Sequence, residues 1–291
     1  MLNDLEDKVL ATVLLVSYNH EKYIERAINC IINQKTDFKF NIVVADDFST
    51  DNTLEIIKSY QIKYPELISI LDTNRNYGIT KNYQRAFAAI NNCDYVSVLE
   101  GDDEWLDDYR LQKHVDFLSH HDNCSMVFNQ YLVYMIEDNT NWVQPFLSNM
   151  RYEFISIETL INDNIIGNFS TCTYRLANLK RIKSELFDLV AYDWMINIYQ
   201  AQFGKIGYLP QVMSVYYLHS GGTWSSKTRE QQVRDLINII DIYDKFYEHK
   251  YNSAFNLHKE RLENELSVGN IVKRNLKSRL KIIYNKLKKV I

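Results

Sequence analysis

The sequence is poor in residues that interrupt or cross-link a chain. It has 3 prolines and 8 glycines in 291 residues, whereas 46% of its residues are hydrophobic. Such a chain can bury one substantial core and still carry a helical extension, and no repeat or low-complexity linker is evident. Its 4 cysteines stand far apart without a CxxC pair. This spacing favours a reducing compartment over a disulfide scaffold or a zinc site.

The sequence also lacks an excess of positive charge and a long apolar run. Its net charge is -4 and its isoelectric point is near 6.0. Nucleic-acid binding needs clustered positive charge, so we expect no nucleic-acid partner. The stretch MLNDLEDKVL lacks the pattern of a secretion signal, and no apolar run approaches the roughly 20 residues that span a bilayer. We therefore expect a cytoplasmic protein that does not cross a membrane.

Short β-prone runs and amphipathic helical stretches alternate over about the first hundred residues. Apolar residues between 24 and 32 recur at positions i, i+3, i+4, i+7 and i+8, which form one face of a helix. The pattern predicts strands at 12–18, 41–45, 67–71 and 95–99, and helices at 24–32, 54–60 and 81–91. This order is typical of a doubly wound parallel sheet covered by helices.

The rest of the chain changes character twice. Residues 124–218 mix β-prone stretches, at 125–136 and 169–174, with a helix that begins near Asp193. From about Ser226 the pattern is helical, and it ends in a basic amphipathic segment at 272–291. Two interpretations of this segment stay open. Either it lies on the inner face of an anionic membrane as a peripheral contact, or its apolar stripe packs on the protein or on the second subunit of a homodimer.

Polar residues follow each predicted strand of the first half. Ligands of doubly wound sheets bind beyond the carboxyl ends of the strands, so these tips are the first candidates for chemistry. The polar tips are Ser17-Tyr18-Asn19-His20, Asp46-Asp47, Asp72-Thr73-Asn74 and Glu100-Gly101-Asp102-Asp103. We expect them to face one crevice.

The last of these tips concentrates negative charge. Like charges repel unless a cation or a proton compensates them, so Glu100, Asp102 and Asp103 form a candidate Mg²⁺ or Mn²⁺ site. A solvated acidic turn before the next helix is the alternative. The pair Asp46-Asp47 is open between a metal site, a phosphoacceptor and a turn that starts a helix.

Several separated runs resemble family 2 glycosyltransferases of the GT-A fold. The N-terminal half carries VSYNHEKYIERAINCIINQ, VVADDFSTDNT, NRNYGITKNYQRAF and VSVLEGDDEW. Two later runs, AYDWMINIYQAQFGKIGYL and YYLHSGGTWS, resemble the acceptor-side base motif and the closing His-Gly loop of bacterial members. The resemblance covers about residues 10–225. It implies an α/β, Rossmann-like GT-A domain with a mainly parallel central sheet over 1–225 and a helical extension over 226–291. Within the domain it implies a nucleotide-sugar-binding half at about 10–120 and an acceptor-binding half at about 121–225.

The resemblance also implies which residues meet the nucleotide-sugar donor. Asp47 contacts the nucleotide base, framed by the tip of the first strand, and Lys81 reaches the base or the diphosphate. Glu100 contributes through the ribose or a water molecule, and Trp224 helps to close a lid. The residues expected at the donor are Ser17, Tyr18, Asn19, Asp46, Asp47, Lys81, Glu100, Gly101, Asp103 and Trp224.

Three further roles follow from the resemblance. Asp102 holds the Mn²⁺ or Mg²⁺ ion, and His219 completes the metal shell or touches the diphosphate. Asp193 is the catalytic base, which takes the proton of the acceptor hydroxyl in an in-line displacement that inverts the anomeric carbon. An ordinary helix N-cap is the alternative for Asp193, and the two roles are compatible.

The leading hypothesis is thus an inverting, metal-dependent glycosyltransferase. It moves a sugar from a nucleotide-diphosphate donor, UDP-linked by expectation, to a glycan or lipid-linked acceptor in surface polysaccharide biosynthesis. Two alternatives stay open: a GT-A-like protein that binds sugar nucleotides or glycans without turnover, and a nucleotidyltransferase. The second would need a Gly-rich basic loop after the first strand, where this sequence has SYNHEKY.

Overall fold

The computed structural model describes residues 9–144, 153–189, 193–222, 224 and 226–287, with side chains as far as Gly269. Contacts divide the chain into two compact units, Met1–Ser220 and Gly221–Ile291. We call them the first and the second unit. The domain boundary that the sequence predicts at residue 225 stays a prediction.

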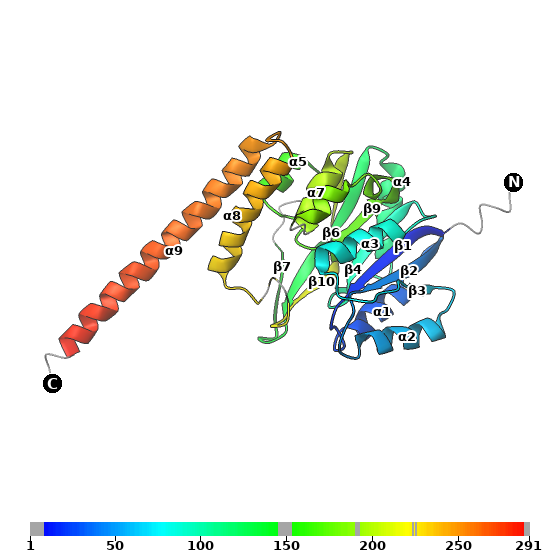
Figure 1. Ribbon diagram of the computed structural model, residues 1–291, viewed down its shortest axis with the longest axis horizontal. Coiled ribbons are helices and arrows are strands. Elements are labelled where there is room, and N and C mark those ends of the chain that lie inside the picture. The colour runs from blue at the N-terminus through cyan, green and yellow to red at the C-terminus, as the bar shows by residue number, and fades with distance from the viewer. Residues whose placement is uncertain (1–8, 145–152, 190–192, 223, 225, 288–291) are drawn as a thin grey trace. The chain divides into compact units, whose positions relative to one another are not determined.

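A mixed sheet forms the centre of the first unit (Figure 1). Its strands lie in the order β3-β2-β1-β4-β9-β6-β10-β5, while β7 pairs with β6 and β8 with β10. Strands β3, β2, β1 and β4 are parallel neighbours, as are β6 and β10, and the other pairs are antiparallel. The strands are β1 (Val9–Ser17), β2 (Lys39–Asp46), β3 (Ile68–Ile70), β4 (Tyr95–Glu100), β5 (Glu104–Trp105), β6 (Cys124–Met135), β7 (Thr140–Val143), β8 (Glu153–Ile155), β9 (Cys172–Arg175) and β10 (Lys205–Leu218).

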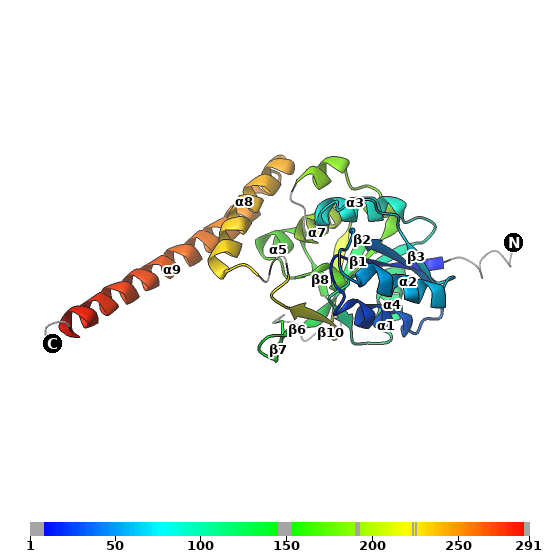
Figure 2. The same ribbon diagram turned by 60° about the horizontal axis from the view of Figure 1, so that its bottom comes forward.

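Helices cover both faces of this sheet (Figure 2). Strands β2 and β3 lie on one side of β1 in the sheet, and β4 lies on its other side. Because connections between parallel strands are right-handed, α1 and α2 lie on one face of the sheet and α3 on the other. Helix α4 lies on the same face of the sheet as α1 and α2, and α7 lies on the same face as α3. The helices are α1 (Ile24–Ile32), α2 (Thr53–Lys63), α3 (Ile79–Ala89), α4 (Arg110–His120), α5 (Ile157–Asn162), α6 (Leu176–Leu179) and α7 (Asp193–Ala201), with 3-10 turns η1 (Phe169–Thr171) and η2 (Ser184–Asp188).

Strand β1 lies at the centre of the parallel part of the sheet. Its last seven residues are buried, as expected for a strand covered by helices on both faces. Helix α1 packs on it through Ile24, Ala27, Ile28 and Ile31, the apolar face that the sequence predicts. Ser17 pairs with Asp46 of β2, and Val16 with Glu100 of β4. The carboxyl ends of three strands, and their polar tips, therefore meet at one edge.

Strands β1 to β4 and helices α1 to α3 overlap the predicted elements, and the differences come later in the chain. The β-prone run at 169–174 begins as the 3-10 turn η1 and becomes β9 only at Cys172. The long strand β10 was not predicted. It contains Pro210, and its register against β6 shifts between Leu209 and Ser214, so the alternation of apolar and polar residues is interrupted.

The second unit consists of two helices, α8 (Arg229–Phe246) and α9 (Asn252–Leu287). Thr228 and Gln231 form a capping box at the start of α8, and Arg229 forms an ion pair with Glu265 of α9. The basic segment at 272–291 falls on α9 and beyond it, where side chains lie outside the described residues. Both interpretations of that segment stay predictions. No helix among the residues that the structure describes is long and apolar enough to cross a membrane.

Candidate active site

The tips of β1 and β2 are joined by side-chain hydrogen bonds. The carboxylate of Asp46 is fully buried and accepts bonds from the Ser17 hydroxyl at 3.0 Å, the Ser49 backbone N–H at 2.8 Å and the Ser49 hydroxyl at 2.5 Å. These bonds occupy the Asp46 carboxylate. The structure gives Asp46 and Ser17 a role in shaping this edge, and direct contact of either with a nucleotide sugar stays a prediction.

Two residues at these tips adopt left-handed backbone conformations. Asn19 has φ 56° and Phe48 has φ 64°, which non-glycine residues adopt rarely. The Asn19 side chain accepts a bond from the Thr50 N–H at 2.8 Å, and its own N–H donates to the Ser49 hydroxyl at 2.9 Å. The turn leaves the rings of Tyr18 and Phe48 about half exposed. Two aromatic faces are thus available at the expected base site, of which the sequence predicted Tyr18 alone.

Asp47 binds the loop that leads into α3. Its two carboxylate oxygens accept the backbone N–H groups of Tyr77, at 2.7 Å, and Gly78, at 2.9 Å. Burial raises the pKa of Asp47, and these two bonds oppose the rise. The side chain therefore already receives N–H donors of the kind that a nucleotide base would offer. To contact the base as predicted, Asp47 would exchange a backbone N–H donor for an N–H donor of the base.

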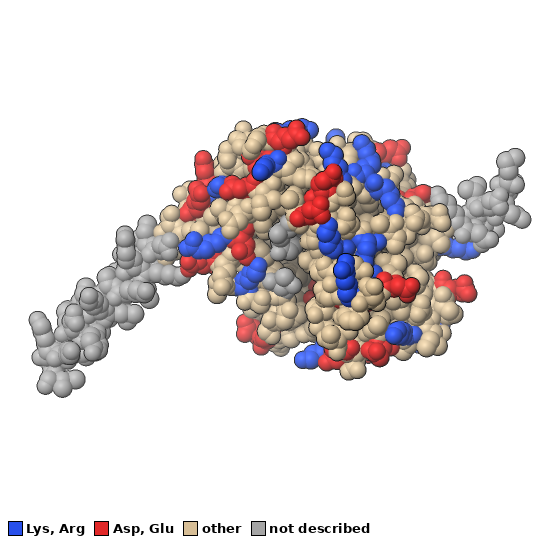
Figure 3. Space-filling model, viewed as in Figure 1, with Lys and Arg blue, Asp and Glu red and all other residues tan. Residues whose placement is uncertain are grey.

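Basic side chains lie along α3. Figure 3 shows Lys and Arg gathered over this helix on the face seen in Figure 1. The Lys81 ammonium contacts the carboxylate of Asp188 at 2.5 Å and the Gln84 amide oxygen at 3.1 Å. Arg85 instead donates to the backbone carbonyls of Asp46, at 2.6 Å, and of Asp72, at 3.1 Å. Lys81 is partly exposed and can change partner, as its predicted contact with the diphosphate requires, whereas Arg85 supports two strand tips.

The β4 tip places carboxylates close to one another. The Glu100 carboxylate is bound by one described donor, the Tyr83 hydroxyl at 3.2 Å. Burial and then the charges of Asp102 and Asp193 raise the pKa of Glu100 to about 8. Asp102 and Asp193 are 91 positions apart in the sequence, yet the charges of both act on Glu100. The two residues predicted as metal ligand and catalytic base thus lie on one acidic site.

Two histidines face Asp102. The Nε2 atom of His219, at the end of β10, lies 3.0 Å from Asp102 Oδ2, and Nε2 of His20 lies 3.6 Å from the same oxygen. Burial raises the pKa of Asp102, but the charge of His20 and the bond from His219 outweigh it, so the net shift is downward. Asp102 is therefore the member of the cluster that stays ionised most readily.

The other two members of the turn are held by the protein. Asp103 is fully buried and accepts the Ser170 hydroxyl at 2.5 Å and the Tyr217 N–H at 3.1 Å. Burial, with the charges of Asp102 and Glu100, raises its pKa well above the ordinary value. A Cβ on Gly101 would lie 2.8 Å from Nδ1 of His20. Gly101 is needed for this close packing, and the predicted donor contacts of Gly101 and Asp103 stay predictions.

Asp193 begins helix α7, as the sequence predicts. Burial raises the pKa of its carboxyl to about 6, against an opposing bond from the Asn164 amide at 3.2 Å. A carboxylate with this pKa takes up a proton near neutral pH, as a general base must. Three tyrosines lie near enough to feel the charge of Asp193: Tyr83, Tyr131 and Tyr216. Burial is the main cause that raises the pKa of each phenol, and the Asp193 charge adds to it. The sequence did not single out these tyrosines because they come from three separate elements.

The donor set fits a divalent ion that also binds substrate. Among the described residues, no three His, Cys, Asp or Glu side chains are grouped to hold a metal ion by themselves. Asp102 Oδ2 and His219 Nε2 lie 3.0 Å apart. Two adjacent ligands about 2.1 Å from an octahedral ion are separated by about this distance, and substrate phosphates commonly supply further ligands. Asp102 and His219 can therefore share one Mn²⁺ or Mg²⁺ ion with a diphosphate.

Of the predicted site residues, only Trp224 belongs to the second unit. Its backbone carbonyl accepts the Gln232 amide, and its ring lies 5.6 Å from the Lys227 ammonium. Its role in a lid stays a prediction. His20 belongs to the polar tip that the sequence predicts after β1, but its position beside Asp102 was not predicted.

Comparisons with known proteins show the family and the fold of this chain. Residues 12–182 match the family model described as glycosyl transferase family 2. An uncharacterized protein of Mycobacterium tuberculosis, Rv1520, is 31% identical over 215 residues, which cover 74% of this chain and 60% of that protein. The chain thus spans less than two thirds of this relative's length.

Two solved structures share the fold. The Staphylococcus aureus TarS 1-349 structure in complex with UDP-GlcNAc aligns with a TM-score of 0.60 at 21% identity, over 80% of this chain and 66% of that one. The mannosyltransferase PcManGT from Pyrobaculum calidifontis, in complex with GDP-Man and Mn²⁺, aligns with a TM-score of 0.59 at 16% identity, over 91% and 80%. The predicted GT-A fold is confirmed.

Proposed function

Because this chain belongs to glycosyl transferase family 2, we propose that it is an inverting, metal-dependent glycosyltransferase. Its donor is a nucleotide-diphosphate sugar and its acceptor is the hydroxyl of a glycan or a lipid-linked saccharide. The observation that carries the proposal is that Asp102 and Asp193, which are 91 positions apart, both lie near enough to the Glu100 carboxyl to raise its pKa. A leaving diphosphate and an attacking hydroxyl must approach the same anomeric carbon, so their partners must share one site.

In this mechanism Asp193 acts on the acceptor. Its carboxylate takes the proton of the acceptor hydroxyl while the oxygen attacks the anomeric carbon from the face opposite the leaving group, which inverts the configuration. The raised pKa of Asp193, about 6, keeps it an effective base near neutral pH. The Asn164 amide, 3.2 Å from Asp193 Oδ2, orients the carboxylate.

On the opposite side, Asp102 and His219 would hold the metal ion. When bound, a divalent ion offsets the negative charge that grows on the departing nucleoside diphosphate. The residues at the β1 and β2 tips hold the nucleotide: Tyr18 and Phe48 offer exposed aromatic faces, and Asp47 offers a carboxylate to the base. Lys81 exchanges Asp188 for the diphosphate.

The donor is proposed to be UDP-linked. The complex of TarS with UDP-GlcNAc supports uridine, and that of PcManGT with GDP-Man and Mn²⁺ supports the use of manganese. We further propose a cytoplasmic role in surface polysaccharide biosynthesis, with residues 1–225 as the transferase domain. The segment at 272–291 would bring the enzyme to an anionic membrane. Turnover, rather than sugar-nucleotide binding alone, is favoured by the presence of both Asp102 and Asp193.

The test is a donor panel. Purified protein is incubated with UDP-, GDP- and dTDP-sugars, with and without MnCl₂, and thermal stability and release of free nucleotide are measured. We expect stabilisation by one nucleotide class that depends on Mn²⁺, together with slow hydrolysis of that donor. Stabilisation by every class without need of metal would contradict the proposal.

A further inference from the structure

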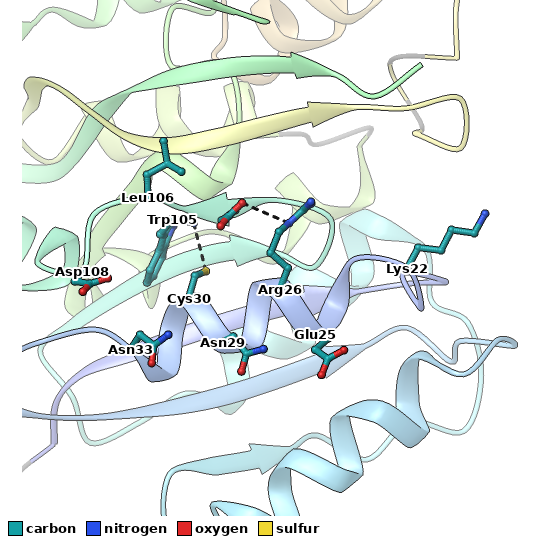
Figure 4. Close-up of a pocket in the computed structure, with 10 residues that line it drawn as sticks. Lys22, Glu25, Arg26, Asn29, Cys30, Asn33, Trp105, Leu106 and Asp108 are labelled. Carbon is teal, nitrogen blue, oxygen red and sulfur yellow. Dashed lines mark hydrogen bonds and ion pairs between the residues drawn. The ribbon is translucent and has the colours of Figure 1, made fainter. Parts of the chain in front are cut away.

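Arg26 reaches from helix α1 to the turn that carries Asp102. It lines an open groove of about 560 Å³ between α1 and residues 104–108, and Figure 4 shows its side chain extending away from the helix. Because the groove is open, about a third of the Arg26 side chain is exposed.

The guanidinium has partners on two elements besides its own. Its Nη2 atom donates to the backbone carbonyl of Asp102 at 2.9 Å, and its Nε atom lies 3.6 Å from Glu104 Oε2. The guanidinium carbon lies 3.6 Å from the centre of the Tyr217 ring, on β10. A planar cation can stack on a ring and donate at its edge at the same time, which an ammonium cannot do.

Further contacts connect the partners of Arg26 to the predicted metal ligands. The Tyr217 hydroxyl donates to the same Glu104 oxygen at 2.8 Å, and its backbone N–H donates to Asp103. Two residues beyond Tyr217, the ring of His219 reaches Asp102. Arg26 is thus bonded to the backbone of one predicted ligand and stacked beside the strand end that carries the other.

We propose that Arg26 is a positioning residue for the metal site. It fixes the turn at Asp102 against the end of β10, so that the Asp102 carboxylate and the His219 ring arrive preassembled for one divalent ion. Partners that orient metal ligands typically change metal affinity by about 10–100-fold when they are lost. The inference rests on the proposed function, because it takes Asp102 and His219 as the ligands.

The test compares Arg26→Gln and Arg26→Lys with the wild-type full chain. Asn33→Ala is the matched control, since Asn33 lines the same groove and has no described contact with Asp102. Binding of UDP and of GDP is measured by calorimetry over a series of MnCl₂ concentrations, and thermal unfolding is measured without metal.

For Arg26→Gln we expect the Mn²⁺ concentration that gives half-maximal nucleotide binding to rise about ten-fold or more. Metal-free nucleotide binding should stay within about two-fold, which a general loss of structure would not allow. Arg26→Lys should give a smaller rise, because it keeps the charge and loses the planar fork. Asn33→Ala should match wild type.

An unchanged Mn²⁺ requirement in Arg26→Gln would overturn the inference and leave the proposed function standing. If Arg26→Gln does not fold, Arg26→Lys decides, and a wild-type Mn²⁺ requirement in that variant overturns the inference. Nucleotide binding by the wild type that ignores Mn²⁺ altogether would instead overturn the proposed function, and the inference with it.

Discussion

The ends of β2 and β4 both carry clustered acidic residues, but the protein surrounds Asp46 and Asp47 differently from Glu100. At β2, Asp46 and Asp47 accept hydrogen bonds from serine hydroxyls and backbone N–H groups. At β4, Glu100 lies within reach of the charges of Asp102 and Asp193, and one hydroxyl donates to it. A carboxylate with protein donors fixes the shape of a tip, whereas mutually repelling carboxylates are stabilised by a cation. Two acidic tips that look alike in the sequence therefore have different roles: one fixes the shape of the sheet edge and the other suits a cation.

The largest effect should follow from Asp193→Asn. Loss of a general base typically lowers the rate by about 10²–10⁴-fold, and we expect transfer to fall by about 1000-fold. Mn²⁺-dependent donor binding should be unchanged, because the Asn amide keeps the size of the side chain. Single-turnover transfer and calorimetry measure the two quantities, and Asp116→Asn, on the exposed surface of α4, is the control. Transfer at the wild-type rate would refute the base assignment.

The comparison of the two tips can be tested by stability. Asp46→Ala removes the acceptor of three described bonds, so we expect the free energy of unfolding to fall by about 2 kcal/mol. Glu100→Gln should instead raise the free energy of unfolding. The pKa of Glu100 is about 8 when folded against an ordinary 4.5, so the folded chain retains a proton that the unfolded chain releases. Stability from this group therefore falls as pH rises through this window.

Removing the Glu100 charge should thus stabilise the metal-free protein by about 2 kcal/mol at pH 8.5 and by less at pH 5. Urea unfolding at both pH values measures this difference, and Glu185→Gln on the exposed η2 turn is the control. If Asp46→Ala and Glu100→Gln change stability in the same direction, the contrast between the tips is wrong.

A smaller effect is expected from pH alone. The base must be deprotonated to act, and the pKa of Asp193 is about 6. Above pH 6 kcat/KM should be level, and below it kcat/KM should fall by about ten-fold per pH unit. Steady-state rates between pH 4.5 and 8 at saturating Mn²⁺ test this. The residual activity of Asp193→Asn should show no such slope, and a slope that persists there would assign the pKa to another group.

The smallest effect concerns Lys81. An exposed ionic contact contributes at most about 1 kcal/mol, so Lys81→Ala should raise the KM for the donor by no more than about five-fold, with kcat nearly unchanged. Asp188→Ala is the matched variant, because it frees the Lys81 ammonium. It should leave the KM unchanged or lower it. A higher KM in Asp188→Ala would mean that the ion pair, and not the free ammonium, serves the donor.

Much of this site could be predicted because it lies at strand ends. A buried strand must be continuously apolar, so the first polar residues after it mark its tip, as at Ser17, Asp46 and Glu100. The sequence also predicts the helix that begins at Asp193. The strand β10 was missed, because Pro210 and a shifted register interrupt its pattern, and Tyr217 was missed with it.

The amino-acid sequence by itself determined which polar groups stand at the ends of the strands, because burial of each strand depends on its own residues. Only the tertiary structure decided which of those groups meet. The contacts of Asp102 with His20 and His219, and of Arg26 with Tyr217, join residues as many as 191 positions apart, through pairings of strands that no local pattern specifies. Equally, only packing distinguished Asp46, held by serine hydroxyls, from Glu100, placed among like charges, since burial and neighbours set what a carboxylate can do.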